Sequence, residues 1–378
     1  MKEKIHYLDG LRGLAALIVL NAHYVDSFCE NNHYESTIQK TPLNLFYNGN
    51  FSVCMFFILS GYVLSYSFFN TKNSDVVIVS AVKRYFRLLG PVLASVIVAY
   101  LLLKLDLFSN IEFCKKTGST WLVGYYNFVP NFLDALKQGL YKAFLYEEYS
   151  YNPILWTMHL ELLGSFFTFA FLVLFGKLKK RYLIYTTLIL IFLNTYYLAF
   201  LLGILLCDLK VNVFPYIKYT NSKIVLFVLL LVSLFFSSYP KIDVQNTIYG
   251  PLEISRVVIN SRLFYHIIGS FLLVYVLLCS QLLQKLFSNP LMKFLGRISF
   301  SLYAIHLIII CSFSSSLYIY LLSHFSYKIS FFISYIVSVS FTFLIAHASY
   351  FLFDKQSIKL GNRVYSFIDS ENKFLKIK

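Results

Sequence analysis

The sequence predicts an all-α, polytopic integral membrane protein with about ten transmembrane helices. Of its 378 residues, 58% are hydrophobic and only 13% are charged, a composition well outside the range of soluble domains. The apolar residues gather in long stretches, and most of these approach the ~20 residues that a helix needs to cross a bilayer. A water-soluble protein is therefore excluded.

The apolar stretches define the expected spans in order along the chain. They are Leu8–Ser27, Phe51–Asn70, Leu89–Phe108, Pro153–Phe175, Tyr182–Leu193, Thr195–Cys207, Ile224–Ser238, Leu263–Leu283, Ile298–Leu322 and Ile329–Phe353. The fifth and sixth are short and are joined only by Asn194, so the sequence also allows one long helix there. A single helix would invert the topology of everything that follows.

The distribution of charge sets the orientation. With the N terminus inside, every predicted cytoplasmic segment is basic, whereas the outer segments are nearer to balance, as the positive-inside rule requires. Both termini are then cytoplasmic, and the net charge of +15 reflects topology and contact with anionic headgroups, not nucleic acid. The inner residues are Lys2, Lys4, Lys72, Lys83, Arg84, Arg87, Lys177, Lys179, Lys180, Arg181, Lys210, Lys218, Lys223, Lys285, Lys293, Arg297, Lys355, Lys359 and Arg363; the outer acidic residues are Asp26, Glu30, Glu35, Asp106, Glu112, Asp134, Glu147 and Glu148.

The organisation is that of a single domain over residues 1–378, without a linker or internal repeat. The longest segment between spans, 109–152, is predicted on the outer side. Within it, Asn131–Leu145 has the apolar spacing of an amphipathic helix, which would lie on the membrane or cover a cavity.

The cysteines predict no metal site, because none of the six forms a CxxC pair. A Cys29–Cys114 disulfide on the outer side is conceivable but is not favoured. The apolar run that follows Lys2 and Lys4 resembles a signal peptide, yet no small-residue cleavage site follows it.

Ionisable residues inside the predicted spans are the candidate functional residues, because they are costly in a membrane. Arg12 and His23 are eleven residues apart in the first span, so they share a helix face and lie about 16 Å apart along the axis. They either mark a site or reach separately to the inner and outer interfaces.

Glu161 lies in the fourth span at an estimated depth close to that of His23. A histidine is a natural partner for a membrane carboxylate, which would fix the imidazole tautomer. The alternative is a structural Glu161 that accepts hydrogen bonds from hydroxyl groups. His159 points to a different side of the helix and is predicted to pack or to orient a neighbour.

Two further groups carry candidate roles. Tyr303 and His306 are three residues apart on one face of a late span, where they form either a proton relay or a helix–helix hydrogen bond. Arg84 and Arg87 form one cationic fork at the inner end of the third span, suited to phosphate. The alternative for this fork is ordinary positive-inside charge.

These residues are also where the sequence resembles the integral membrane acyltransferases of the acyltransferase-3 type, which O-acylate sugars. The resemblance covers essentially the whole chain. Its elements are, in order, Leu8–Ala16 followed by His23, Phe56–Tyr62 with the Phe-Ser-Gly element around Ser60, the Arg84 and Arg87 pair, the Trp156–Glu161 run, and Ser299–His306.

The resemblance implies about ten helices, no metal, and an acyl donor, acetyl-CoA or another acyl-CoA, bound from the cytoplasm. The acceptor would be a carbohydrate presented on the outer side. His23 would be the general base or a transient acyl carrier, and Glu161 would orient it. Arg12, Arg84 and Arg87 would bind the phosphates of the donor.

The sequence departs from the family pattern at His159 and Leu160, and it shows no appended hydrolase-like domain. We therefore expect a stand-alone O-acetyltransferase that acts on a lipid-linked glycan, lipopolysaccharide or exopolysaccharide in a bacterial plasma membrane. The competing hypothesis is a transporter or flippase of a glycan or small anion, since charge inside a ten-helix bundle also suits a substrate pathway.

Overall fold

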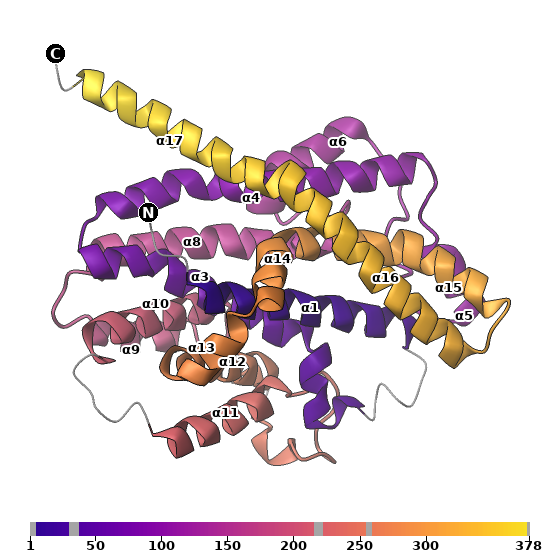
Figure 1. The fold of residues 1–378 in the computed structure, drawn as a ribbon, viewed down its shortest axis with the longest axis horizontal. Helices are drawn as coiled ribbons and strands as arrows, with labels where there is room; N and C mark the ends of the chain where they lie inside the picture. Colours follow the sequence, from indigo (N-terminus) through magenta and orange to yellow (C-terminus); the bar gives the residue numbers. More distant parts are fainter. Residues whose placement is uncertain (1–4, 30–37, 215–221, 255–258, 376–378) are drawn as a thin grey trace. The chain divides into compact units, whose positions relative to one another are not determined.

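The computed structural model describes residues 5–29, 38–214, 222–254 and 259–375, with side chains to residue 368. Throughout these residues the regular structure is helical, as predicted (Figure 1). The chain forms two compact units, and each is assembled from three stretches: Met1–Val19, Ser36–Ala81 and Leu160–Arg297 in unit 1, and Leu20–Glu35, Val82–His159 and Ile298–Lys378 in unit 2. The charged residues Lys2, Lys4, Glu30, Glu35 and Lys218 lie outside the described part.

Unit 1 contains a core in which α3 packs directly against α10. Its elements are the start of α1 (His6–Phe28), η1 (Pro42–Tyr47), α3 (Gly49–Thr71), the start of α4 (Asp75–Lys104), most of α8 (Trp156–Phe175), α9 (Tyr182–Ile191), α10 (Tyr197–Asn212), α11 (Lys223–Ser237), η6 (Gly250–Leu252), α12 (Ser261–Cys279), α13 (Gln281–Phe287) and the start of α14 (Pro290–Ile309).

Glycines allow α3 and α10 to approach closely. A Cβ on Gly61 would lie 2.2 Å from the carbonyl oxygen of Phe200, and a Cβ on Gly203 would lie 2.2 Å from that of Ile58. Both distances are far below van der Waals contact, so neither position accepts a side chain without moving a backbone. Gly61 belongs to the Phe-Ser-Gly element of the sequence, which therefore has a packing role.

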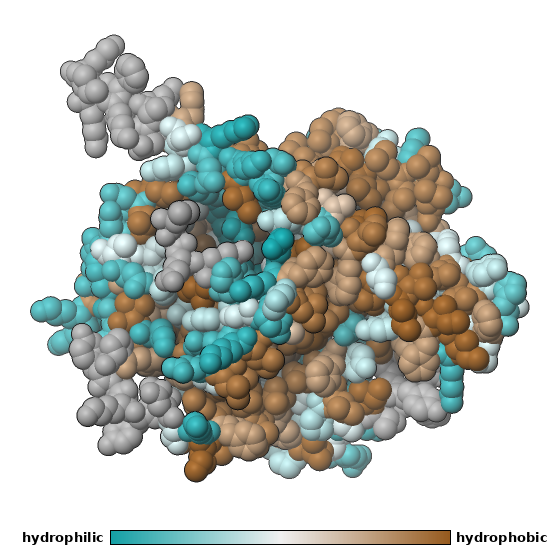
Figure 2. Space-filling model, in the orientation of Figure 1, coloured by the Kyte–Doolittle hydropathy of each residue, from teal (hydrophilic) through white to brown (hydrophobic). Residues whose placement is uncertain are grey.

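Unit 2 contains the second part of α1, from Leu20 onward, and the C-terminal helices. Its other elements are most of α4, α5 (Asn110–Thr117), α6 (Phe132–Lys137), the π-helix η2 (Gln138–Lys142), α7 (Ala143–Leu145), η3 (Pro153–Leu155), the start of α8, the end of α14, the π-helix η7 (Ile310–Ser314), α15 (Ser315–Leu322), α16 (Tyr327–Ser349), the π-helix η8 (Tyr350–Asp354) and α17 (Lys355–Leu375). Figure 2 shows hydrophobic residues along α15 and α16, as expected of helices that face lipid.

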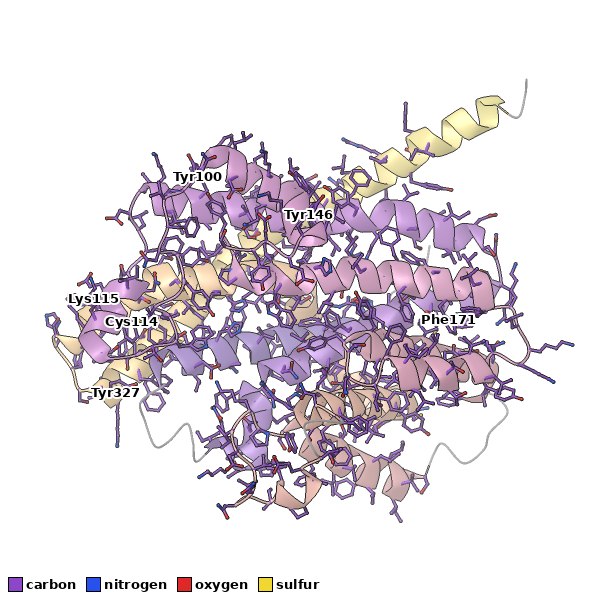
Figure 3. The ribbon with its side chains drawn as sticks, turned by 180° about the vertical axis from the view of Figure 1, so that it is seen from behind. Tyr100, Cys114, Lys115, Tyr146, Phe171 and Tyr327 are labelled. Atoms are coloured by element: carbon purple, nitrogen blue, oxygen red, sulfur yellow. The ribbon has the colours of Figure 1, made fainter. Side chains whose placement is uncertain are left out.

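The predicted amphipathic helix is present as the continuous run of α6, η2 and α7. It packs lengthwise along α4: Phe132 contacts Tyr100 with ring centroids 5.5 Å apart, and the Tyr85 hydroxyl donates to the Leu140 carbonyl at 2.6 Å. Tyr100 and Tyr146 mark this region in Figure 3. The helix prediction is confirmed, while its position along α4 was not foreseen.

Among the described residues, six helices are long and apolar enough to cross a membrane. The Tyr182–Cys207 region forms two helices, α9 and α10, so the prediction of a break there is confirmed. α1 is not among the six, and α9 and α11 are shorter apolar helices. A multi-pass membrane protein is therefore supported, whereas the count of ten spans and the orientation stay predictions. None of the six cysteines, all of which lie in the described part, is in a disulfide, so the Cys29–Cys114 disulfide does not form.

Candidate active site

Two histidines of unit 2 contact each other directly. Nδ1 of His23, in α1, lies 2.7 Å from Nε2 of His306, in α14. The ring centroids are 5.0 Å apart and the ring planes differ by 16°, so the short N–N contact lies nearly in the plane of both rings. That direction suits an imidazole donor and acceptor. His306 is fully buried, whereas His23 is half-buried.

The backbone determines which histidine donates. Nδ1 of His306 lies 2.8 Å from the carbonyl oxygen of Tyr303 and 3.2 Å from that of Leu302. A carbonyl oxygen only accepts, so this Nδ1 carries a hydrogen. In the neutral imidazole, Nε2 of His306 is then an acceptor. His23 therefore donates from Nδ1, and its own Nε2 carries the lone pair that a base requires.

Tyr303 supports this pair through its backbone. Its hydroxyl donates to the Ile154 carbonyl at 2.7 Å and lies 2.7 Å from the hydroxyl of Thr157. The predicted relay through the Tyr303 hydroxyl is therefore replaced by a helix–helix anchor between α14 and the start of α8. The tyrosine carbonyl, not its hydroxyl, contacts His306.

An aromatic wall lies beside His23. The indole of Trp121 has its centroid 5.4 Å from that of His23 and is tilted by 36°. Tyr125 meets Trp121 edge to face, with centroids 5.3 Å apart. Both residues belong to the segment between α5 and α6, which is predicted on the outer side, and both are half-buried. Burial, followed by the neighbouring Cys311 and Asp26, raises the pKa of Tyr125 to about 12.

The loop that carries this wall is anchored on both sides. The amide of Asn110, a fully buried side chain, donates to the carbonyls of Leu122 at 2.9 Å and of Tyr125 at 2.8 Å. Tyr126 takes a left-handed conformation, with φ of 56°, and stacks on Phe108 at 3.8 Å. Trp121 therefore sits on a fixed loop.

Glu161 accepts a hydrogen bond from the hydroxyl of Ser60 at 2.6 Å, within unit 1. This contact agrees with the structural interpretation of Glu161. His23 belongs to unit 2, so the prediction that Glu161 orients it stays a prediction. The Nδ1 that such a carboxylate would bind is engaged with His306.

The predicted donor-binding arginines differ in their surroundings. Arg12 faces Asp9 at 3.5 Å in unit 1, one turn away on α1. In unit 2, Arg84 is 8% exposed and Arg87 is exposed, so the two do not form a uniformly exposed fork. His159 contacts the Phe144 carbonyl at 2.8 Å and Glu147 at 3.3 Å, which fits its predicted orienting or packing role.

Comparison with known proteins identifies the family. The family model described as an acyltransferase domain, acyltransferase-3, matches residues 5–348. The chain belongs to the acyltransferase-3 family. Two curated relatives agree: "Acyltransferase clz18" of Cochliobolus lunatus is 25% identical over 82% of this chain and 84% of its own length, and "O-acetyltransferase PaAT-1" of Phomopsis amygdali is 25% identical over 81% and 72%. No solved structure matches.

This acyltransferase-3 protein is therefore an O-acyltransferase enzyme. Sequence reasoning found both histidines, because an ionisable group in an apolar run stands out. It did not identify Trp121 or Asn110. Aromatic residues make up 19% of the chain, so a single tryptophan in a loop carries little signal, and an asparagine that caps a loop carries none.

Proposed function

We propose that this enzyme transfers an acetyl group from cytoplasmic acetyl-CoA to a hydroxyl of a lipid-linked or exported carbohydrate in the cell membrane. The observation that supports this most directly is the order of hydrogen bonds from the Tyr303 carbonyl through His306 to His23. That order leaves Nε2 of a half-buried imidazole as the basic atom.

In direct transfer, Nε2 of His23 removes the proton of the acceptor hydroxyl as its oxygen attacks the thioester carbonyl. The C–S bond then breaks, and the departing thiolate takes the proton from the imidazolium. His306 stays neutral and holds the ring in register. In the covalent variant, Nε2 attacks the thioester carbonyl, the C–S bond breaks and the CoA thiolate leaves an acyl-imidazole behind. The acceptor oxygen then attacks the acyl carbon, the imidazole leaves, and the hydroxyl proton passes to the thiolate.

The donor contacts proposed from the family are Arg12, Arg84 and Arg87. An exposed guanidinium such as that of Arg87 suits bidentate contact with a phosphate. The buried position of Arg84 suits a contact nearer the pantetheine end, where less water competes. Replacing each of these arginines by lysine keeps the positive charge but loses the two parallel N–H groups of the guanidinium. The KM for the donor should rise most in Arg87→Lys, because Arg87 is the one proposed to contact the phosphates.

The test is transfer of labelled acetyl-CoA to glycan in membranes that contain wild-type enzyme or His23→Ala at equal protein levels. We expect wild type to label glycan and His23→Ala to lose about 10²- to 10⁴-fold of the rate, the usual contribution of a general base. His324→Ala is the matched control, because His324 is an exposed histidine at the end of α15. Equal labelling by His23→Ala and wild type would remove His23 from the mechanism.

A further inference from the structure

The rings of Trp121 and Tyr125 form a corner beside the proposed base. Trp121 lies 5.4 Å from His23 between centroids, and Tyr125 closes the corner at 71° to the indole. His306 occupies the Nδ1 edge of His23, so the Nε2 edge is the one on which an acceptor must arrive. The indole is a large apolar face near that arrival point.

Hydrogen bonds to the loop hold the Trp121–Tyr125 corner in shape. Asn110 fixes the backbone at Leu122 and Tyr125, and the Ser119 hydroxyl donates to the Ser27 carbonyl of α1 at 3.2 Å. This last bond joins the loop to the helix that carries His23, four residues away. A preformed face loses little conformational entropy on binding, which favours recognition.

Chemistry limits what such a face can hold. A tryptophan and a tyrosine offer negative π-faces, which attract C–H groups of slight positive charge. Pyranose rings present an apolar C–H face and a rim of hydroxyls, so one ring can stack while a rim hydroxyl meets a base. A carboxylate or phosphate would meet the repulsive side of the π-system.

We propose that Trp121 and Tyr125 are the acceptor subsite, on which the indole stacks against a pyranose ring and brings one ring hydroxyl to Nε2 of His23. This proposal rests on the proposed acyl transfer and specifies its acceptor contact. Its rival is that Trp121 only packs against His23 and keeps the imidazole in place.

Kinetics separate these two roles. For Trp121→Ala we expect the KM for the sugar acceptor to rise about tenfold, the effect of roughly 1.4 kcal/mol of lost stacking, while the KM for acetyl-CoA stays unchanged. Trp121→Phe, which keeps a smaller ring, should fall between. Tyr146→Ala is the matched control: Tyr146 is another aromatic residue of the outer segment, 66% exposed (Figure 3). A fall in kcat with the acceptor KM unchanged in both Trp121 variants would overturn the proposal.

Binding can be measured without transfer, because the chain has only two tryptophans. Trp156→Phe leaves Trp121 as the single indole, and its fluorescence can be titrated with methyl pyranosides in lipid nanodiscs, which avoid sugar-based detergents. We expect a saturable change with pyranosides, also in the His23→Ala background, and none with cyclohexanol or 2-naphthol at the same concentration.

The possible outcomes separate the acceptor subsite from the proposed acyl transfer. Saturable pyranoside binding without any acetyl transfer would retain the subsite and refute the proposed function. Acetyl transfer to sugar with an acceptor KM that Trp121→Ala leaves unchanged would refute the subsite and retain the proposed function. A response to 2-naphthol alone would overturn the carbohydrate assignment. If Trp156→Phe disturbs folding, the kinetic comparison of Trp121→Ala, Trp121→Phe and Tyr146→Ala decides alone.

Discussion

The two histidines of the His23–His306 pair in unit 2 have different surroundings, although the side chains are chemically identical. His306 is fully buried, and both of its nitrogens have partners, the backbone carbonyls on Nδ1 and His23 on Nε2. His23 is half-buried and donates through Nδ1. Of this pair, we therefore expect His23 to exchange a proton with a substrate and His306 to act as a positioning residue that fixes the tautomer of the base.

His306→Leu should lower kcat about 10- to 100-fold, the cost typical of losing the partner that orients a working histidine. The leucine removes the acceptor of the His23 Nδ1 hydrogen, so the imidazole can turn or change tautomer. His306→Gln keeps an acceptor oxygen near the position of Nε2 and should retain most of the rate. The measurement is kcat, both KM values and the pH profile of kcat in each variant.

A purely structural role for His306 would give a different pattern. The thermal midpoint would then fall with both substitutions, and the pH profile of the remaining activity would match that of wild type. Under the positioning role, the pH profile of His306→Leu shifts and that of His306→Gln does not.

The sequence predicted His23 and His306 separately as candidate residues, but it did not predict that they contact each other. An ionisable residue in an apolar run is visible in the sequence, and its depth can be estimated from helix rise. Which helices meet depends on packing between distant stretches, and 283 residues separate His23 from His306. Glu161 illustrates the limit: its depth suggested a histidine partner, which stays a prediction, but depth alone could not foresee the hydrogen bond that it accepts from the Ser60 hydroxyl.

The loop between α5 and α6 depends on one side chain for its shape. Asn110→Ala should lower the free energy of unfolding by about 1–3 kcal/mol, because two loop carbonyls lose a buried donor. The same change should raise the acceptor KM, since Trp121 and Tyr125 lie on that loop. Thermal unfolding and steady-state kinetics of Asn110→Ala measure both effects.

Asn110→Asp is the informative companion to that variant. It has nearly the shape of asparagine but no amide hydrogens, so it should be at least as damaging as alanine. Stability of Asn110→Asp equal to wild type would show that the two hydrogen bonds contribute nothing to the loop.

The contact between α3 and α10 predicts a contrast between two glycines. Gly61→Ala should destabilise unit 1 by about 1–3 kcal/mol or more, because the added methyl group meets the Phe200 carbonyl of a packed helix. Gly124→Ala should be close to neutral, since nothing lies within 4 Å of its Cβ position. Thermal midpoints of the two variants test the contrast, and equal midpoints would contradict it.

The sequence predicted the individual helices better than it predicted which elements pack against each other. The apolar runs located α3, α8 and α16 because a bilayer demands continuous apolar length. The Asn131–Leu145 periodicity predicted a helix and its apolar face, but periodicity carries no information on what covers that face. α4 lies along this segment and contacts it through Tyr85 and Tyr100, while Phe132 and Leu133 stay more than half exposed.

In the whole molecule, the chain passes repeatedly from one unit into the other. Four boundaries between the two units fall inside α1, α4, α8 and α14, so each of these helices contributes residues to both units. At these four boundaries no linker separates the units, in agreement with the single domain that the sequence indicated; the boundary between Glu35 and Ser36 lies outside the described residues. A helix that continues through a boundary cannot melt in one unit without disturbing its turns in the other.

We therefore expect both units to unfold in one cooperative transition. The cysteines report on each unit separately: Cys54 and Cys207 are buried in unit 1, and Cys114 and Cys311 are buried in unit 2. With Cys29 and Cys279 replaced by serine, one variant keeps only the first pair and another only the second. Labelling by a thiol-reactive dye during heating in nanodiscs should give the same midpoint, to within about 2 °C, for both pairs and for loss of helical circular dichroism. A pair that reacts at a distinctly lower temperature would show that its unit unfolds independently, and the helices shared between the units would then have to break at Val19, Ala81, His159 or Arg297.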